Sequence, residues 1–136
     1  MPLRGQPEEP RAVNTNRPVN LDLTTIKQPL TAITSILHRI SGIVLFLSLP
    51  FALWMLDKSL SSEAGFNELK SCLSSPLSKV LVLAVLAALV YHLVAGIRHL
   101  IMDLGFGETK EGGLLGSRVI LVVAVVLFVL VGIWLW

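Results

Sequence analysis

Three long runs without a charged residue constrain how this chain can fold. The runs cover residues 40–56, 80–97 and 119–136, and the helical pattern of the first begins upstream, at about Thr31. Because a bilayer core about 30 Å thick requires roughly 17 to 25 helical residues, each run is long enough to cross a membrane once. Backbone groups in hydrocarbon must bond within their own segment, so helices are expected despite the Val and Ile content. The sequence predicts an all-α membrane protein with three transmembrane helices.

Composition excludes most other classes of protein. Of the 136 residues 54% are hydrophobic and 15% charged, with a mean hydropathy of +0.76, whereas a soluble domain averages about 25% charged residues. The net charge of +2 gives no footprint for nucleic-acid binding. The single cysteine, Cys72, cannot form an internal disulfide and has no metal-binding spacing around it, so we expect it to be inert. Phosphate-binding loops, zinc clusters and nucleophile elbows are absent from the sequence.

The predicted organisation has two parts. Residues 1–28 form a polar N-terminal arm without the apolar core of a signal peptide. Residues 29–136 form the membrane domain, with helices at about 30–56, 77–104 and 117–136. Ser75 and Pro76 are suited to cap and begin the second helix. The glycine-rich segment 104–116 is predicted to be a flexible turn into the third helix.

Basic residues near the helix ends predict the orientation. One side of a three-span chain would carry Arg4, Arg11, Arg17, Lys27, Arg39, Arg98, Lys110 and Arg118. The other side would carry Lys58, Lys70 and Lys79. In a bacterial inner membrane this places the N-terminus in the cytoplasm and the C-terminus in the periplasm. Trp54, Trp134 and Trp136 would then lie at the outer interface, where aromatic residues are enriched.

Polar residues near the start of the first helix are candidates for a functional site. Ser35, His38 and Arg39 have helical spacing, with Ser35 and Arg39 four residues apart. Ionisable groups at membrane depth usually face a cavity or a partner. The simpler alternative is that Arg39 snorkels to the headgroups with His38 beside it.

The second helix carries one stripe of small and polar residues, made of Ala84, Ala88, His92, Gly96, His99 and Asp103. Small residues at this spacing usually indicate close helix packing, but His92 also needs a hydrogen-bond partner or a metal. Because a b-type haem takes a neutral imidazole nitrogen as axial ligand, His92 is the candidate ligand, and Gly96 would leave room for the macrocycle. His99 lies about 10.5 Å further along and cannot bind the same iron. Arg98, His99 and Asp103 could contact haem propionates or the surface of a partner, or they could simply be solvated at the end of the helix. Tyr91 could donate a hydrogen bond in a pocket or could only be packed.

The sequence resembles the cytochrome b membrane-anchor subunits of succinate dehydrogenase, of the bacterial, haem-containing type with two anchor subunits. The resemblance rests on residues 17–23 (RPVNLDL), 29–32 (PLTA), 35–42 (SILHRISG) and 92–103 (HLVAGIRHLIMD). Together with the three spans it covers about residues 17–136. It implies a three-helix unit that forms half of a heterodimeric helical bundle.

The resemblance implies roles for particular residues. His92 would be an axial ligand of haem b, with the second ligand a histidine of the partner anchor. Ser35 and Arg39 would line a ubiquinone pocket, with Ile36 and Leu23 as apolar walls. The haem propionates would contact His38, Arg39 and His99. Gln28 departs from the bulkier apolar residue expected in relatives.

The function implied is that of a membrane anchor in succinate:quinone oxidoreductase. Its partners would be a second membrane-anchor subunit, an iron–sulfur subunit and a flavoprotein subunit, and FAD and the iron–sulfur clusters would be held by the last two. Electrons from succinate would pass to ubiquinone, and this chain alone would catalyse nothing. The alternatives are a fumarate reductase anchor, a stand-alone b-type electron carrier with both ligands in this chain, and a structural subunit without haem.

Overall fold

A computed structural model describes residues 25–136, and these residues are mostly helical. The helices are α1 (Leu30–Ser61), α2 (Glu63–Leu73), α3 (Pro76–Asp103) and α4 (Lys110–Leu135). Of these α1, α3 and α4 are long and apolar enough to cross a membrane. The predicted all-α fold with three membrane spans is therefore confirmed. Most of the predicted N-terminal arm, with Leu23, lies outside the described residues; residues 25–28 are exposed and precede α1.

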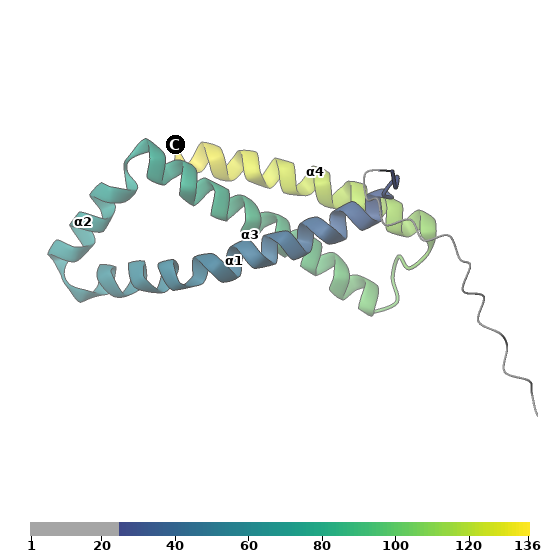
Figure 1. Cartoon of the computed structure of the whole chain (residues 1–136), viewed down its shortest axis with the longest axis horizontal. Coiled ribbons are helices and arrows are strands. Elements are labelled where there is room, and N and C mark those ends of the chain that lie inside the picture. The colour runs from purple at the N-terminus through teal and green to yellow at the C-terminus, as the bar shows by residue number, and fades with distance from the viewer. Residues whose placement is uncertain (1–24) are drawn as a thin grey trace, which may run out of the picture.

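The three long helices form an open bundle (Figure 1). Helices α1 and α3 cross near their middles, and α4 runs beside them with the C-terminus close to the start of α3. Helix α2 bridges α1 and α3 at that same end. Trp54 and Trp136 both lie at this end. The amine of Lys58 lies 5.8 Å from the ring centroid of Trp54, and the amine of Lys79 lies 5.4 Å from that of Trp136.

The connection between the first two spans is helical, which the sequence analysis did not predict. Helix α1 continues to Ser61, beyond the predicted end at about residue 56. Ser62 then takes an extended conformation and starts α2, its hydroxyl accepting a hydrogen bond from the Gly65 amide at 3.0 Å. An ion pair of 2.9 Å between Lys58 and Glu68 joins the two helices. The predicted cap of α3 is confirmed, since the Ser75 hydroxyl accepts from the Ser78 amide.

The third span begins earlier than predicted, at Lys110. Thr109 caps it by accepting a hydrogen bond from the Gly112 amide at 3.0 Å. The flexible turn is confined to the residues before that cap, where Gly105 and Gly107 have positive φ angles of 86° and 78°. Gly112 and Gly113 belong to the helix and were wrongly predicted to be in the turn.

Small residues hold the helices together. The side chains that are buried in the long helices are mainly those of Thr34, Ser41, Ala95, Ser117, Ile120 and Ala124. The hydroxyls of Thr34 on α1 and Ser117 on α4 lie 3.2 Å apart, and Ser117 also donates to the Gly113 carbonyl at 2.9 Å. From α3 the Tyr91 hydroxyl donates to the Thr34 carbonyl at 2.9 Å. Close approach and interhelical hydrogen bonds are the main sources of helix association in lipid.

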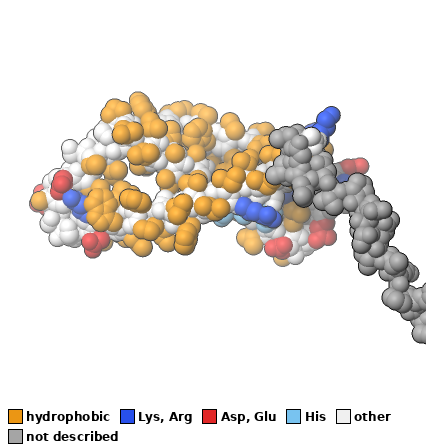
Figure 2. Space-filling view, in the orientation of Figure 1, with side chains coloured by type: hydrophobic (Ala, Val, Ile, Leu, Met, Phe, Trp, Pro, Cys, Tyr) orange, Lys and Arg blue, Asp and Glu red, His pale blue; other side chains and the backbone are white. Residues whose placement is uncertain are grey.

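Large apolar side chains cover the outside of the bundle. On the face shown in Figure 2 they fill the central part, while charged side chains gather towards the two ends. Phe46, Leu47, Leu93 and Val122 are each more than half exposed. This surface is suited to contact with lipid or with other membrane helices.

Replacing Ser117 tests the interhelical packing. Ser117→Ala removes the contact with the Thr34 hydroxyl, which joins α1 and α4, together with the bond to the Gly113 carbonyl, and should lower the free energy of unfolding by about 0.6 to 1.7 kcal/mol. Ser117→Leu should cost several kcal/mol, because Ser117 is fully buried and a larger side chain forces α1 and α4 apart. Thermal unfolding in detergent measures both. Val122→Leu on the exposed face of α4 is the control, and a Ser117→Leu variant as stable as this control would contradict the packing.

Candidate functional site

Three histidines from two helices gather near the point where α1 and α3 cross. The ring of His38 on α1 stacks on that of His92 on α3, with centroids 4.2 Å apart and planes inclined by 19°. The His38 ring also contacts the ring of His99, with centroids 5.1 Å apart and planes inclined by 42°. The structure thus brings together the histidine predicted to bind iron and two of those predicted to contact propionates.

Each helix presents a glycine to a histidine of the other. A Cβ atom on Gly42 would lie 3.0 Å from Cε1 of His92, which is too close for ordinary packing. A Cβ atom on Gly96 would lie 3.7 Å from Nε2 of His38. The role expected for Gly96 is therefore corrected: the group beside it is the His38 imidazole, so this glycine serves the contact between α1 and α3.

The hydrogen bonds of His92 determine which nitrogen carries its proton. Nδ1 lies 3.1 Å from the carbonyl oxygen of His38 and 3.1 Å from the hydroxyl of Ser41. The carbonyl can only accept, and the Ser41 hydroxyl already donates to that same carbonyl at 2.8 Å. Two acceptors would repel each other at this distance, so Nδ1 is assigned as the donor, with its single N–H shared between the two oxygens. In the neutral ring the lone pair is then on Nε2, which makes no hydrogen bond to the described residues.

This arrangement is typical of histidines that bind metals. A ligating histidine commonly donates its second N–H to a backbone carbonyl, which fixes the tautomer and the ring orientation. Ser41 takes part in this and was missed by the sequence analysis, although it lies in a quoted motif. Its position three residues after His38 was the available signal, because a serine there bonds back to the preceding turn.

His38 is held differently. Its Nε2 is buried without a hydrogen-bond partner among residues 25–136, and it lies against Gly96. Nδ1 is therefore the nitrogen that could reach a ligand in this arrangement. No group of three or more His, Cys, Asp and Glu residues in the described part of the chain could hold a metal ion by itself.

The residues expected to bind quinone lie outside this cluster. Ser35 is half-buried, while Arg39 and Ile36 are exposed on α1. Within the described residues neither the Ser35 hydroxyl nor the Arg39 guanidinium has a hydrogen-bond partner or an ion pair. Leu23 lies outside the described residues, and Gln28 is exposed just before α1. The structure thus leaves two polar groups at helical spacing free on one side of α1.

Two other polar residues of α3, Tyr91 and Arg98, have structural partners. Tyr91 bonds to the Thr34 carbonyl, which accounts for it as an interhelical contact. Arg98 turns to α4 and donates to the Gly113 carbonyl at 3.0 Å, so it does not join the histidines. Asp103 and Cys72 are exposed.

Comparison with known proteins decides the family. The family model described as the succinate dehydrogenase/fumarate reductase transmembrane subunit matches residues 13–131. The chain belongs to this family. It is 44% identical over 125 residues to the succinate dehydrogenase cytochrome b556 subunit of Coxiella burnetii, covering 91% of this chain and all of that protein. The cytochrome b556 subunit of Paracoccus denitrificans is 36% identical over 115 residues, covering 85% and 88% of the two chains.

A third relative, named for a cytochrome b560, shows the same relation. The succinate dehydrogenase cytochrome b560 subunit of Reclinomonas americana is 37% identical over 118 residues, which are 80% of this chain and 79% of that protein. The matched segments include the membrane helices in which His38, His92 and Ser41 lie. The resemblance inferred from the sequence motifs is therefore confirmed at the level of the family: this chain is a transmembrane subunit of succinate dehydrogenase/fumarate reductase type.

The tautomer of His92 can be measured directly. In the ¹⁵N-histidine-labelled chain in lipid, without added haem, solid-state NMR should show His92 with a protonated Nδ1 and an unprotonated Nε2. The Ser41→Ala variant should keep this tautomer, because the His38 carbonyl remains as acceptor. A protonated Nε2 with a bare Nδ1 would contradict the hydrogen-bond assignment.

Proposed function

We propose that this chain is the haem- and quinone-binding membrane-anchor subunit of a bacterial succinate:ubiquinone oxidoreductase. The observation that carries the proposal is the free Nε2 of His92, whose ring is fixed through Nδ1 by His38 and Ser41. Because Nδ1 is the donor, the lone pair of the neutral ring is on Nε2, where it is available to a ligand. The family and the names of the relatives, which are cytochrome b subunits, support haem b as the ligand.

The residues present fit one axial ligand from this chain. The rings of His38 and His92 are stacked at 4.2 Å and leave no room for a haem between them, so these two histidines would not both hold its iron. His99 stands on the same helix as His92, two turns further along. The second ligand would therefore come from the partner anchor subunit. This argues against a stand-alone carrier with both ligands in one chain.

Charged and polar groups beside His92 suit the acidic edge of a haem. His38 and His99 lie within one cluster, and Arg39 adds a cation one residue after His38. We infer that these three contact the propionates, with His38 acting through Nδ1. When bound, haem b supplies a one-electron redox centre within the membrane.

The quinone site would be formed on α1 together with partner subunits. A quinone needs an apolar cleft and a few donors for its carbonyl oxygens. The Ser35 hydroxyl would donate to one oxygen, and the Arg39 guanidinium would stabilise negative charge on it during reduction through a charge-assisted hydrogen bond. Ile36 and Leu23 would supply apolar walls. The unpartnered state of Ser35 and Arg39 in this chain supports the assignment.

The rest of the enzyme would be supplied by the partners. The flavoprotein subunit with FAD oxidises succinate, and the iron–sulfur subunit passes the electrons to ubiquinone, which also takes up two protons. These subunits would dock on the cytoplasmic side, at the N-terminal arm and the start of α1. The second membrane-anchor subunit would complete the helical bundle, covering the apolar surface near His92. The protein would span the bacterial inner membrane with its C-terminus in the periplasm.

Removing the ligand tests the haem assignment. His92→Leu should abolish or strongly alter the b-type absorption of the purified complex, because it removes the Nε2 that is proposed to bind the iron. Leu100→Ala, at an exposed position of α3, is the control and should retain the band, since the ligand and the propionate contacts are kept. An unchanged spectrum in His92→Leu would refute the ligand assignment.

Removing the cation tests the quinone site. Arg39→Leu should abolish succinate–quinone reduction, while succinate oxidation with an artificial dye acceptor continues at its normal rate. The change removes a charge-assisted bond of about 3 kcal/mol, which corresponds to a loss of at least about a hundredfold. Arg118→Leu, at an exposed position of α4, should leave both activities unchanged. Normal quinone reduction in Arg39→Leu would contradict the assignment, and loss of both activities would indicate failed assembly.

A further inference from the structure

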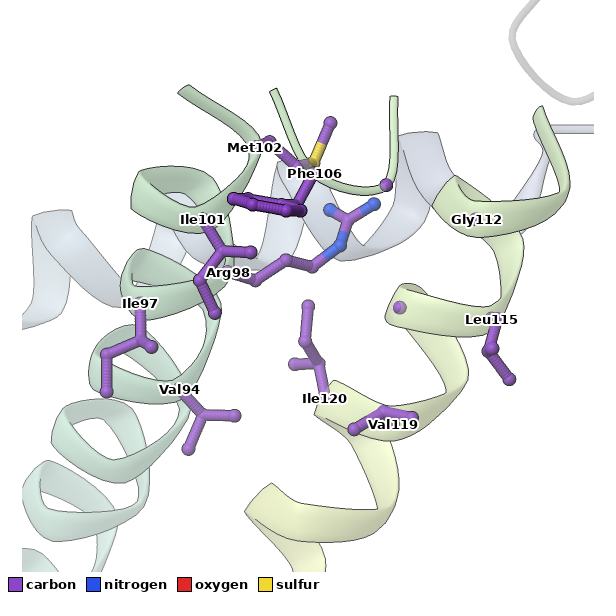
Figure 3. A pocket seen from close by; sticks show the side chains of 12 residues that line it. Val94, Ile97, Arg98, Ile101, Met102, Phe106, Gly112, Leu115, Val119 and Ile120 are labelled. Carbon is purple, nitrogen blue, oxygen red and sulfur yellow. The ribbon is translucent and has the colours of Figure 1, made fainter. Parts of the chain in front are cut away.

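An apolar groove lies between α3 and α4, apart from the histidine cluster (Figure 3). Its volume is about 450 Å³, within the range of small-molecule sites. Val94, Ile97 and Ile101 of α3 face Val119 and Ile120 of α4 across it. Phe106, from the turn between these helices, lies at one end.

The groove opens on the side of α3 away from His92. Ile101 follows His92 by nine residues, which is about two and a half turns and places it on the opposite face of the helix. A partner that supplies a haem ligand beside His92 would therefore not cover the groove. On that side the groove is open to lipid of the surrounding bilayer.

One cation stands at the end of this apolar groove. The side chain of Arg98 leaves α3 towards α4, close to Phe106. A guanidinium has five N–H donors. Within the described residues that of Arg98 makes one hydrogen bond, to the Gly113 carbonyl. No carboxylate of residues 25–136 forms an ion pair with Arg98, although Asp103, Glu108 and Glu111 lie near it in the sequence.

A glycine keeps the arginine in this place. A Cβ atom on Gly116 would lie 2.7 Å from Nε of Arg98, so a larger residue there would displace the side chain. The combination of an apolar channel, a fixed cation and unused donors requires an occupant that is apolar along its length and anionic at one end. Basic pockets between transmembrane helices near a membrane surface bind anionic lipid headgroups.

We propose that this groove binds one acyl chain of an anionic phospholipid whose phosphate accepts hydrogen bonds from Arg98. The charge argues for this occupant over a quinone tail, which carries no anion. It also argues for phosphatidylglycerol or cardiolipin over a zwitterionic phospholipid, because the positive charge of Arg98 has no partner in the described chain.

The first test counts lipids on the intact complex. The complex, tagged on this chain and purified in mild detergent, is examined by native mass spectrometry after exposure to equal amounts of phosphatidylglycerol, cardiolipin and phosphatidylethanolamine. We expect one anionic phospholipid to remain bound, and Arg98→Gln to reduce its retention about tenfold through loss of charge-assisted hydrogen bonds. Arg118→Gln, which removes an exposed arginine of α4 outside the groove, should change nothing.

A second pair of variants keeps the test decisive if Arg98→Gln does not assemble. Val119→Phe fills the groove from an exposed position and should also reduce retention of the lipid, while Val125→Phe, equally exposed on α4 but outside the groove, should not. Equal retention in Val119→Phe and Val125→Phe would overturn the proposal. Equal loss in Arg98→Gln and Arg118→Gln, retention of phosphatidylethanolamine in place of an anionic lipid, or recovery of quinone from the groove would do so as well.

Discussion

The hydrogen bond from Nδ1 of His92 to the carbonyl of His38 connects the packing of the bundle with its chemistry. It joins α1 to α3 at 3.1 Å. The same bond fixes the tautomer of His92 and leaves Nε2 with the lone pair that a metal requires. Because the acceptor is a backbone oxygen, substitution of the His38 side chain would not remove it. Ser41 strengthens the arrangement from the following turn of α1.

This bond depends on how closely α1 and α3 approach. Gly42 leaves space for the ring of His92, and Gly96 leaves space for that of His38. A similar principle operates between α3 and α4, where Gly116 accommodates Arg98 and the Gly113 carbonyl accepts its hydrogen bond. In lipid, helices gain little from burying apolar surface against each other, so small residues and a few hydrogen bonds must determine the geometry. The glycines of this chain are therefore structural at several helix contacts.

Hydropathy predicted the spans well because the bilayer imposes both their length and their helical state. It failed at α2 and at the start of α4, where the chain is outside the hydrocarbon or where glycines suggested a turn. The stripe on α3 predicted His92 as a haem ligand, which stays a prediction, and the structure shows the ring of His92 bonded through Nδ1 to α1. The partners of that residue, Ser41 and the His38 carbonyl, depend on how α1 crosses α3, and spacing along one helix cannot reveal this. For the same reason the spacing along α3 could not show that the Arg98 side chain points to α4 and not to the histidines.

The most direct test of the account is an optical difference spectrum of the detergent-solubilised complex tagged on this chain. The succinate-reduced minus oxidised spectrum is recorded, with dithionite reduction as the measure of total haem. The account predicts a b-type band that succinate elicits, because this chain would hold haem b beside the route from succinate to quinone. A band seen with dithionite alone would indicate a different electron donor or a stand-alone carrier. The absence of a band with either reductant would contradict the assignment of His92 as a haem ligand.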